Sequence, residues 1–265
     1  MITINYVYCI GFNCNATRFM INNGLRKFAS PFDYMHTDFE SSLENIDTNF
    51  ENYLCDMVHI KQDSNICELV LKKNLECIPE QLQFKDKLTY MTFSYYDHNL
   101  FTNANYISKD LSSNVYDWKK KQLWLHHDLL NDHYINTIQN RVERFKALYS
   151  KFYENTILFH LGKIETIDNF EEYKNNILLI IKKNNIKAYV IKIVCSDNLE
   201  EQHIFEEKDR CLIIVKKVPS YIEQTSIKIT ENDTGIYDYK KEFEIIKQYF
   251  NFDNLISYSD SENNW

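Results

Sequence analysis

A cysteine at the start of a helix is the residue in this sequence best suited to nucleophilic chemistry. Cys14 follows an apolar run at residues 4–10, which predicts a buried strand ended by Gly11, and it precedes a helical pattern at residues 15–23. The dipole and the unpaired amides of a helix N-terminus favour a thiolate and lower the pKa of a thiol placed there. The alternative interpretation is an unreactive buried thiol, because free cysteine often packs as a small apolar residue.

Two adjacent histidines, His126 and His127, could supply a general base. They follow residues 122–125, a short run that predicts a strand. Catalytic groups of parallel sheets gather at the carboxyl ends of the strands, so we expect these histidines at the same sheet edge as Cys14. A cysteine activated by a neighbouring histidine is the nucleophile of thiol hydrolases. A histidine in such a place is alternatively a surface residue.

The apolar patterns predict the elements that must position these groups. Helices are expected within residues 34–52 and over 134–152, 170–183 and 240–249, and strands over 156–161, 188–195 and 211–215. This alternation predicts an α/β fold of three layers, in which helices flank a mostly parallel or mixed central sheet and Cys14 lies at the N-terminus of the first helix. Residues 53–117 carry no clear pattern. We expect one domain over residues 1–258 and a polar, frayed tail at 259–265.

Composition excludes several classes of protein. The chain has 265 residues, of which 44% are apolar and 26% charged, values typical of a globular domain rather than a disordered, fibrous or membrane protein. Its net charge of −8 lacks the basic surface that phosphate binding requires, so nucleic acid is not an expected partner. The N-terminus has neither a basic region nor an apolar run long enough for a signal peptide or a span.

The cysteines indicate a reducing compartment. There are seven, an odd number, scattered without a Cys-x-x-Cys pair, so neither a disulfide framework nor a zinc ribbon is expected. The acidic residues are dispersed and the histidines lack a spacing that closes a zinc site, so we predict no metal and no cofactor. A cytoplasmic location fits this pattern.

Four short blocks of the chain form a distinctive pattern. The blocks are Gly11-Phe12-Asn13-Cys14, Ser30-Pro31-Phe32-Asp33-Tyr34, His127-Asp128 and Arg141-Val142-Glu143-Arg144-Phe145. Together they resemble the papain-like cysteine peptidase family of uncharacterised bacterial and viral proteins. They occur in the family's order and span roughly residues 4–220. The second block departs from the family's usual Pro-Phe-Asp-Trp by carrying Tyr34, which keeps an aromatic ring. The papain label itself implies a helix-rich lobe packed on a β-rich lobe, whereas the alternation of elements favours the three-layer α/β fold.

The resemblance implies that Cys14 is the nucleophile and His127 the general base, with His126 as the alternative base or a substrate-binding residue. It also singles out Asp33, which orients the histidine or binds substrate, or else merely hydrogen-bonds a turn that begins at Pro31 or caps the next helix. If the protein is viral, the expected location is the cytoplasm of the host cell.

The remaining candidates come from position. Asp197 and Asn198 follow the strand at 188–195, where a carboxylate or amide could fix the histidine tautomer. Arg141 and Arg144 lie three residues apart on a helix and either hold an anionic substrate group or pair with acidic neighbours such as Glu143.

Two further polar residues complete the candidate site. The Asn13 side chain and the Cys14 amide would suit an oxyanion hole. His160, near the end of the strand at 156–161, either binds substrate or faces solvent.

Three functions remain open at this stage. The first is a thiol hydrolase that cleaves a peptide or isopeptide bond through a Cys-His thioester. The second is an acyltransferase that resolves the same thioester with an amine or a hydroxyl. The third is a catalytically inactive binding domain whose partner surface is the aromatic-rich stretch at residues 88–106. The expected substrate is a protein, a peptide or an acyl-bearing molecule, and the sequence leaves the oligomeric state open.

Overall fold

The computed structural model describes most of both ends of the chain and shorter pieces of its middle. The described residues are 1–11, 14–33, 35–51, 53–54, 57–63, 66–71, 77–78, 83–84, 100–103, 107–110, 115–118, 122–124, 132–165, 167–196, 198–217 and 239–257. They contain five α-helices and three sheets of three or more strands, together with a two-stranded pair. The mixed α/β class with a mostly parallel central sheet is confirmed.

The central sheet has five strands in the order β14, β15, β13, β12, β2. Their bounds are β2 Tyr6–Cys9, β12 Thr156–Ile164, β13 Tyr189–Ser196, β14 Gln202–Glu206 and β15 Cys211–Lys217. The strands β2, β12, β13 and β15 run parallel, and β14 pairs antiparallel with β15 at the edge. Because both faces of the parallel strands are covered, their residues form nearly continuous buried runs.

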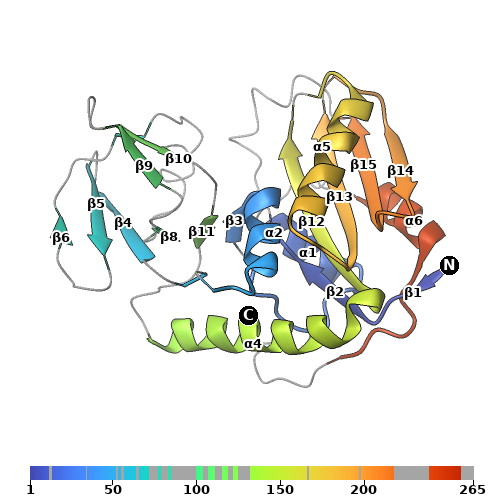
Figure 1. Ribbon diagram of the computed structural model, residues 1–265, viewed down its shortest axis with the longest axis horizontal. Coiled ribbons are helices and arrows are strands. Elements are labelled where there is room, and N and C mark those ends of the chain that lie inside the picture. Colours follow the sequence, from blue (N-terminus) through green and yellow to red (C-terminus); the bar gives the residue numbers. More distant parts are fainter. Residues whose placement is uncertain are drawn as a thin grey trace.

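Helices cover both faces of this sheet (Figure 1). On one face lie α2 Phe39–Asp47, α4 Asp132–Phe152 and α5 Phe170–Lys183, which share a core with Tyr8 and Leu158. On the other face lie α1 Cys14–Asn22 and α6 Lys240–Tyr249, which share a second core with Phe159. The Phe19 ring of α1 stacks on that of Phe159 with centroids 4.7 Å apart, which fixes the helix against β12.

The helices begin and end where local chemistry dictates. Asn169 caps α5 by accepting hydrogen bonds from the backbone N–H groups of Glu171 and Glu172, and Asp38 caps α2 by accepting one from Ser41. After α1 the chain turns at Gly24, whose φ of +67° lies in the left-handed region typical of helix C-termini. The 3-10 turn Tyr153–Asn155 (η2) joins α4 to β12.

The middle of the chain contributes strands that pair antiparallel, except that β7 and β10 run parallel. A six-stranded sheet has the order β3, β11, β8, β4, β5, β6, and a three-stranded sheet the order β7, β10, β9. Their bounds are β3 Met35–Thr37, β4 Met57–Asp63, β5 Ile66–Leu71, β6 Cys77–Ile78, β7 Gln83–Phe84, β8 Leu100–Asn103, β9 Ile107–Asp110, β10 Val115–Trp118 and β11 Gln122–Trp124. Near the chain ends, β1 Ile2–Thr3 pairs with β16 Phe250–Asn251.

Two expectations from the sequence need correction. The strand at 122–124 is β11, which pairs antiparallel with β3 and β8 and does not belong to the parallel sheet. The short pattern at residues 122–125 cannot distinguish the two kinds of sheet, so the expectation of a parallel strand is wrong. The helix expected within residues 34–52 is shorter, because β3 occupies 35–37 before α2 begins at Phe39.

None of the helices in the described part of the chain is both long and apolar enough to span a membrane.

Candidate functional site

The turn between β2 and α1 brings Cys14 to the carboxyl edge of the parallel sheet. β2 ends at Cys9, and α1 begins at Cys14. Gly11 in between has φ +110°, and a Cβ atom on it would lie 2.4 Å from Cγ2 of Thr37. The chain therefore passes so close to β3 that glycine is required at this position. The backbone of Cys14 is described, whereas its side chain lies outside the described part of the structure, as does Asn13.

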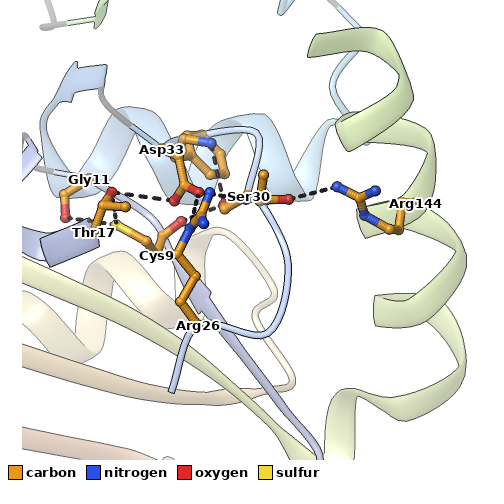
Figure 2. Close-up of polar contacts among 9 residues, drawn as sticks. Cys9, Gly11, Thr17, Arg26, Ser30, Asp33 and Arg144 are labelled. Carbon is orange, nitrogen blue, oxygen red and sulfur yellow. Dashed lines mark hydrogen bonds and ion pairs between the residues drawn. The ribbon is translucent and has the colours of Figure 1, made fainter. Parts of the chain in front are cut away.

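A buried carboxylate lies beside this turn. Asp33 is 1% exposed, and its Oδ2 atom accepts hydrogen bonds from Nε of Arg26 at 2.9 Å and from the backbone N–H of Ser30 at 3.0 Å. Its Oδ1 atom accepts a hydrogen bond from the Thr17 hydroxyl at 3.4 Å. Figure 2 shows the carboxylate between Thr17 and Arg26. Asp33 therefore connects helix α1 to the segment that precedes β3.

Ser30 ties the same segment to the last residue of β2. Its hydroxyl donates to the carbonyl of Cys9 at 2.6 Å and accepts from the backbone N–H of Phe32 at 3.3 Å. The Tyr53 hydroxyl donates to the carbonyl of Pro31 at 2.6 Å. The turn interpretation of Ser30 and Asp33 accounts for the Ser30 N–H bond, but the bonds from Thr17 and Arg26 reach beyond the turn. One carboxylate thus links helix α1, the segment just after that helix and the Ser30 turn.

The two arginines of α4 both face the protein interior. Arg141 is 1% exposed on the buried face of the helix. Arg144 donates from Nη2 to the carbonyl of Ala29 at 2.9 Å, and its guanidinium lies 5.7 Å from the centre of the Phe28 ring. Arg144 therefore fastens α4 to the chain just before Ser30 (Figure 2). A direct contact of either arginine with substrate stays a prediction.

The other predicted residues, His126, His127 and Asp197, lie outside the described residues. The strand that leads to the histidines is nevertheless defined, and Trp124 at its end pairs with Met35 at the start of β3. Our expectation that the histidines follow a strand of the same sheet as Cys14 is wrong, because β11 belongs to the antiparallel sheet. The register instead brings the end of β11 beside the segment that contains Asp33.

A second buried polar cluster is formed where β12 and β13 pair. His160 and Lys192 are neighbours across the two strands, with Nζ of Lys192 3.3 Å from Nδ1 of His160 and 3.3 Å from Oε1 of Glu165. The Phe39 ring packs against both side chains, at 5.2 Å from the imidazole centre and 5.2 Å from the ammonium. His160 is 2% exposed, so the solvent-facing interpretation of this residue is wrong.

Burial also sets the protonation of His160. It lowers the pKa of the imidazole well below its usual value, the positive charge of Lys192 lowers it further, and an interaction with the Thr37 backbone acts in the opposite direction. The imidazole is therefore neutral at pH 7 and can accept a hydrogen bond from the Lys192 ammonium.

The three cysteines whose side chains are described are poor nucleophiles. Cys9, Cys195 and Cys211 are free and buried. Burial raises the pKa of Cys9 to about 12, and the charge of Asp33 adds to this effect. Burial likewise raises the pKa of Cys211 to about 12 and that of Cys195 above its usual value. A thiol that stays protonated at neutral pH does not attack a carbonyl.

Sequence reasoning missed the contacts that surround Asp33 and His160. Arg26 and Thr17 belong to no recognisable motif. Their hydrogen bonds to Asp33 form only when the chain folds and brings these side chains together. Lys192 offered a weak signal, as a charged residue within an apolar strand. Among the described residues no group of three or more His, Cys, Asp or Glu side chains could hold a metal ion.

Comparison of the chain with protein-family models, curated proteins and solved structures gives no match.

Proposed function

We propose that this protein is a thiol hydrolase of the papain-like cysteine peptidase type, which cleaves a peptide or isopeptide bond with Cys14 as nucleophile and His127 as general base. The observation that carries the proposal is the position of Asp33. Its carboxylate contacts the helix that begins at Cys14, and it lies two residues before Met35, the partner of Trp124 at the end of β11. Helix α1 therefore contacts Asp33, and the strand that precedes His127 ends beside the segment that bears this carboxylate.

The short separations in sequence of Cys14 and His127 from residues whose positions are known support this proposal. Thr17, which donates to Asp33, follows Cys14 by three residues, about one turn of helix. His127 follows Trp124 by three residues, and three residues span at most about 11 Å. That span is long enough for His127 to reach Asp33, which lies two residues before the partner of Trp124. Asp33 would then orient the histidine, with Asp197 as the alternative third residue and His126 as the alternative base.

The chemistry follows from these roles. The Cys14 thiolate, stabilised by the His127 imidazolium and by the dipole of α1, attacks the carbonyl carbon of the substrate. The Asn13 side chain and the Cys14 N–H would hold the oxyanion. His127 gives its proton to the departing amine, which leaves a thioester on Cys14. His127 then takes a proton from water, whose attack on the thioester releases the acid and restores the thiol.

Trapping of the thioester tests this proposal. The protein is mixed with a panel of peptide thioesters, and its intact mass is measured over time beside the variants Cys14→Ala, His127→Ala and Cys195→Ser. We expect a mass increase equal to the acyl group in the wild type and in Cys195→Ser, and none in Cys14→Ala. An adduct that persists in Cys14→Ala would overturn the assignment of the nucleophile. Release of the acyl group to an added amine in preference to water would make the protein an acyltransferase.

A further inference from the structure

A buried histidine and a buried lysine lie where the parallel sheet meets the β3–α2 segment, residues 35–47. Nζ of Lys192 is 3.3 Å from Nδ1 of His160, and each of the two residues is 2% exposed. The Phe39 ring, at the start of α2, covers both side chains, with its centre 5.2 Å from the imidazole centre and 5.2 Å from Nζ. The proposed reaction uses neither side chain, so their burial invites a separate explanation.

The ammonium of Lys192 is closely surrounded. A Cβ atom on Gly162 would lie 3.0 Å from Nζ, so the ammonium packs directly against that glycine. Oε1 of Glu165 lies 3.3 Å from Nζ and supplies one negative charge to the cluster. A proton on His160 would therefore place a second positive charge beside the ammonium, in a site where little water screens the repulsion.

The surroundings of His160 offer little to offset that repulsion. In the described part of the chain, Lys192 is the charged group whose field acts on the imidazole. From β3 and α2 the imidazole meets the Thr37 backbone and the Phe39 ring, and neither carries a charge. Protonation of this histidine is thus opposed by burial and by a like charge.

The acidic residues of α2 have other partners. Asp38 caps the helix by accepting a hydrogen bond from the Ser41 N–H at 2.7 Å. Glu40 pairs with Lys183 of α5, and Nζ lies 2.9 Å from Oε1. Their own titration is a separate source of pH dependence, which a variant of His160 leaves in place.

The elements around His160 differ in how firmly they are held. β12 and β13 are inner strands of the parallel sheet, and each has a hydrogen-bonded neighbour on both sides. β3 pairs instead with β11 of the six-stranded sheet. The β3–α2 segment meets the parallel sheet through side chains such as Ser42, whose hydroxyl donates to the carbonyl of Ile10. Repulsion inside the cluster is therefore relieved most readily by movement of this segment.

We infer that His160 and Lys192 form an acid-sensitive contact that releases the β3–α2 segment from the parallel sheet when the imidazole takes up a proton. The proton binds Nδ1, the atom that accepts from the Lys192 ammonium, so that hydrogen bond is lost and two positive charges face each other. Release also separates Thr37 from Gly11 and loosens the turn between β2 and α1. The inference is independent of the proposed function, because it uses neither its nucleophile nor its base.

Hydrogen exchange followed by mass spectrometry tests this device on the full chain. Exchange is measured at pH 7 and pH 5, with labelling times scaled to the intrinsic amide rate at each pH, in the wild type, His160→Gln and Lys192→Gln. His203→Gln is the matched control, because His203 is an exposed histidine on β14. Circular dichroism verifies that each variant is folded at both pH values.

We expect amides of residues 37–47 to exchange roughly tenfold faster at pH 5 than at pH 7 in the wild type, since the released form takes up a proton near the ordinary histidine pKa of about 6.5. Peptides from α5 and β13 keep their protection. His160→Gln removes the acid response, and His203→Gln leaves it unchanged. Lys192→Gln keeps a donor for Nδ1 without the charge, so it weakens the response.

Three results would overturn the inference. Equal protection of residues 37–47 at the two pH values would mean that the cluster accepts the proton without moving the segment. Equal acceleration in α5 and β13 would mean that acid opens the whole domain instead. A full acid response in His160→Gln would assign it to another group. If His160→Gln does not fold, Lys192→Gln decides, because an undiminished response there refutes the repulsion.

Discussion

The Asp33 carboxylate accepts hydrogen bonds from helix α1, from Arg26 just after that helix and from the Ser30 turn. A buried carboxylate that loses its charge leaves the Arg26 guanidinium buried without a counter-ion, which is the expensive half of breaking an ion pair. We therefore expect Asp33→Asn to lower the free energy of unfolding by about 3 kcal/mol.

Urea denaturation at pH 7 measures that loss. The matched control is Glu143→Gln, which breaks the exposed pair with Lys146 and should cost less than about 1 kcal/mol. The double variant Arg26→Gln, Asp33→Asn should lose less than Asp33→Asn, because neither charge is left unpaired. A loss for Asp33→Asn no larger than that of the control would mean that the pair does not hold the site together.

His160 makes the protein sensitive to acid. Because its pKa is lowered in the folded state, the unfolded chain binds a proton below about pH 6.5 that the folded chain excludes. This contribution to stability is fully present above about pH 6.5 and is lost as the pH falls below it.

The variant His160→Gln tests this dependence, because glutamine keeps a polar side chain but does not titrate. The variant loses some stability at pH 7, where the contact with Lys192 is weakened. Its free energy of unfolding should then decline less steeply than that of the wild type between pH 7 and 5, as measured in urea at each pH. Equal declines in the free energy of unfolding of the two proteins would show that protonation of His160 does not destabilise the fold.

The sequence predicts some residues of the candidate site but not others. Cys14 is predictable from the sequence because a helix N-terminus favours a thiolate. That position can be read from the strand and the glycine that precede it. Arg26 has the same residue type as many surface arginines. Its contact with Asp33 depends on how the end of α1 meets the segment before β3, and no local pattern encodes that meeting.

Two glycines with positive φ flank α1, Gly11 before the helix and Gly24 after it. Gly11 and Gly24 both have positive φ, but a Cβ on Gly11 would collide with Thr37, whereas nothing lies within 4 Å of one on Gly24. Gly24→Ala should cost about 1 kcal/mol, the penalty of the left-handed conformation alone. Gly11→Ala carries the same penalty and must also displace β3, so we expect a loss of at least about 3 kcal/mol.

Thermal or urea denaturation of the two glycine variants gives the comparison. Because the closest atom to the added Cβ is Cγ2 of Thr37, Thr37→Ser should recover part of the loss in Gly11→Ala and none in Gly24→Ala. Equal losses in the two glycine variants would show that β3 is not packed tightly against this turn.

The elements were predictable where their patterns were long. The helices expected over residues 170–183 and 240–249 have the same bounds in the structure, because each carries an apolar stripe over several turns. The sequence predicts that β11 belongs to the parallel sheet, which is wrong. It does not predict β14, an edge strand with mixed polarity. Pairing partners of short strands are decided by the whole fold rather than by their own residues.

Across the whole molecule, the central sheet is expected to unfold as one unit. Cys9, Cys195 and Cys211 lie buried on three of its strands, β2, β13 and β15. In increasing urea all three thiols should become open to alkylation over a single transition that coincides with the loss of helical circular dichroism. Labelling of Cys211 at a lower urea concentration than Cys9 would indicate that the β15 edge opens by itself.

The fold class could be predicted at this scale, because alternating helices and apolar strands leave few architectures besides a covered, mostly parallel sheet. The strands between residues 57 and 118 could not be predicted, since that stretch lacks regular alternation. The candidate site was predictable only as residue types on expected sheet edges. Its buried core around Asp33 required the tertiary contacts.

The pH dependence of Cys14 alkylation, in the wild type and in His127→Ala, tests the central claim most directly. Site-resolved mass spectrometry follows each of the seven cysteines, and the raised pKa values of Cys9, Cys195 and Cys211 keep their background low. A thiolate–imidazolium pair predicts that Cys14 is alkylated rapidly at about pH 6 and that His127→Ala abolishes this reactivity. A Cys14 that titrates near about 8.5 in both proteins would contradict the account.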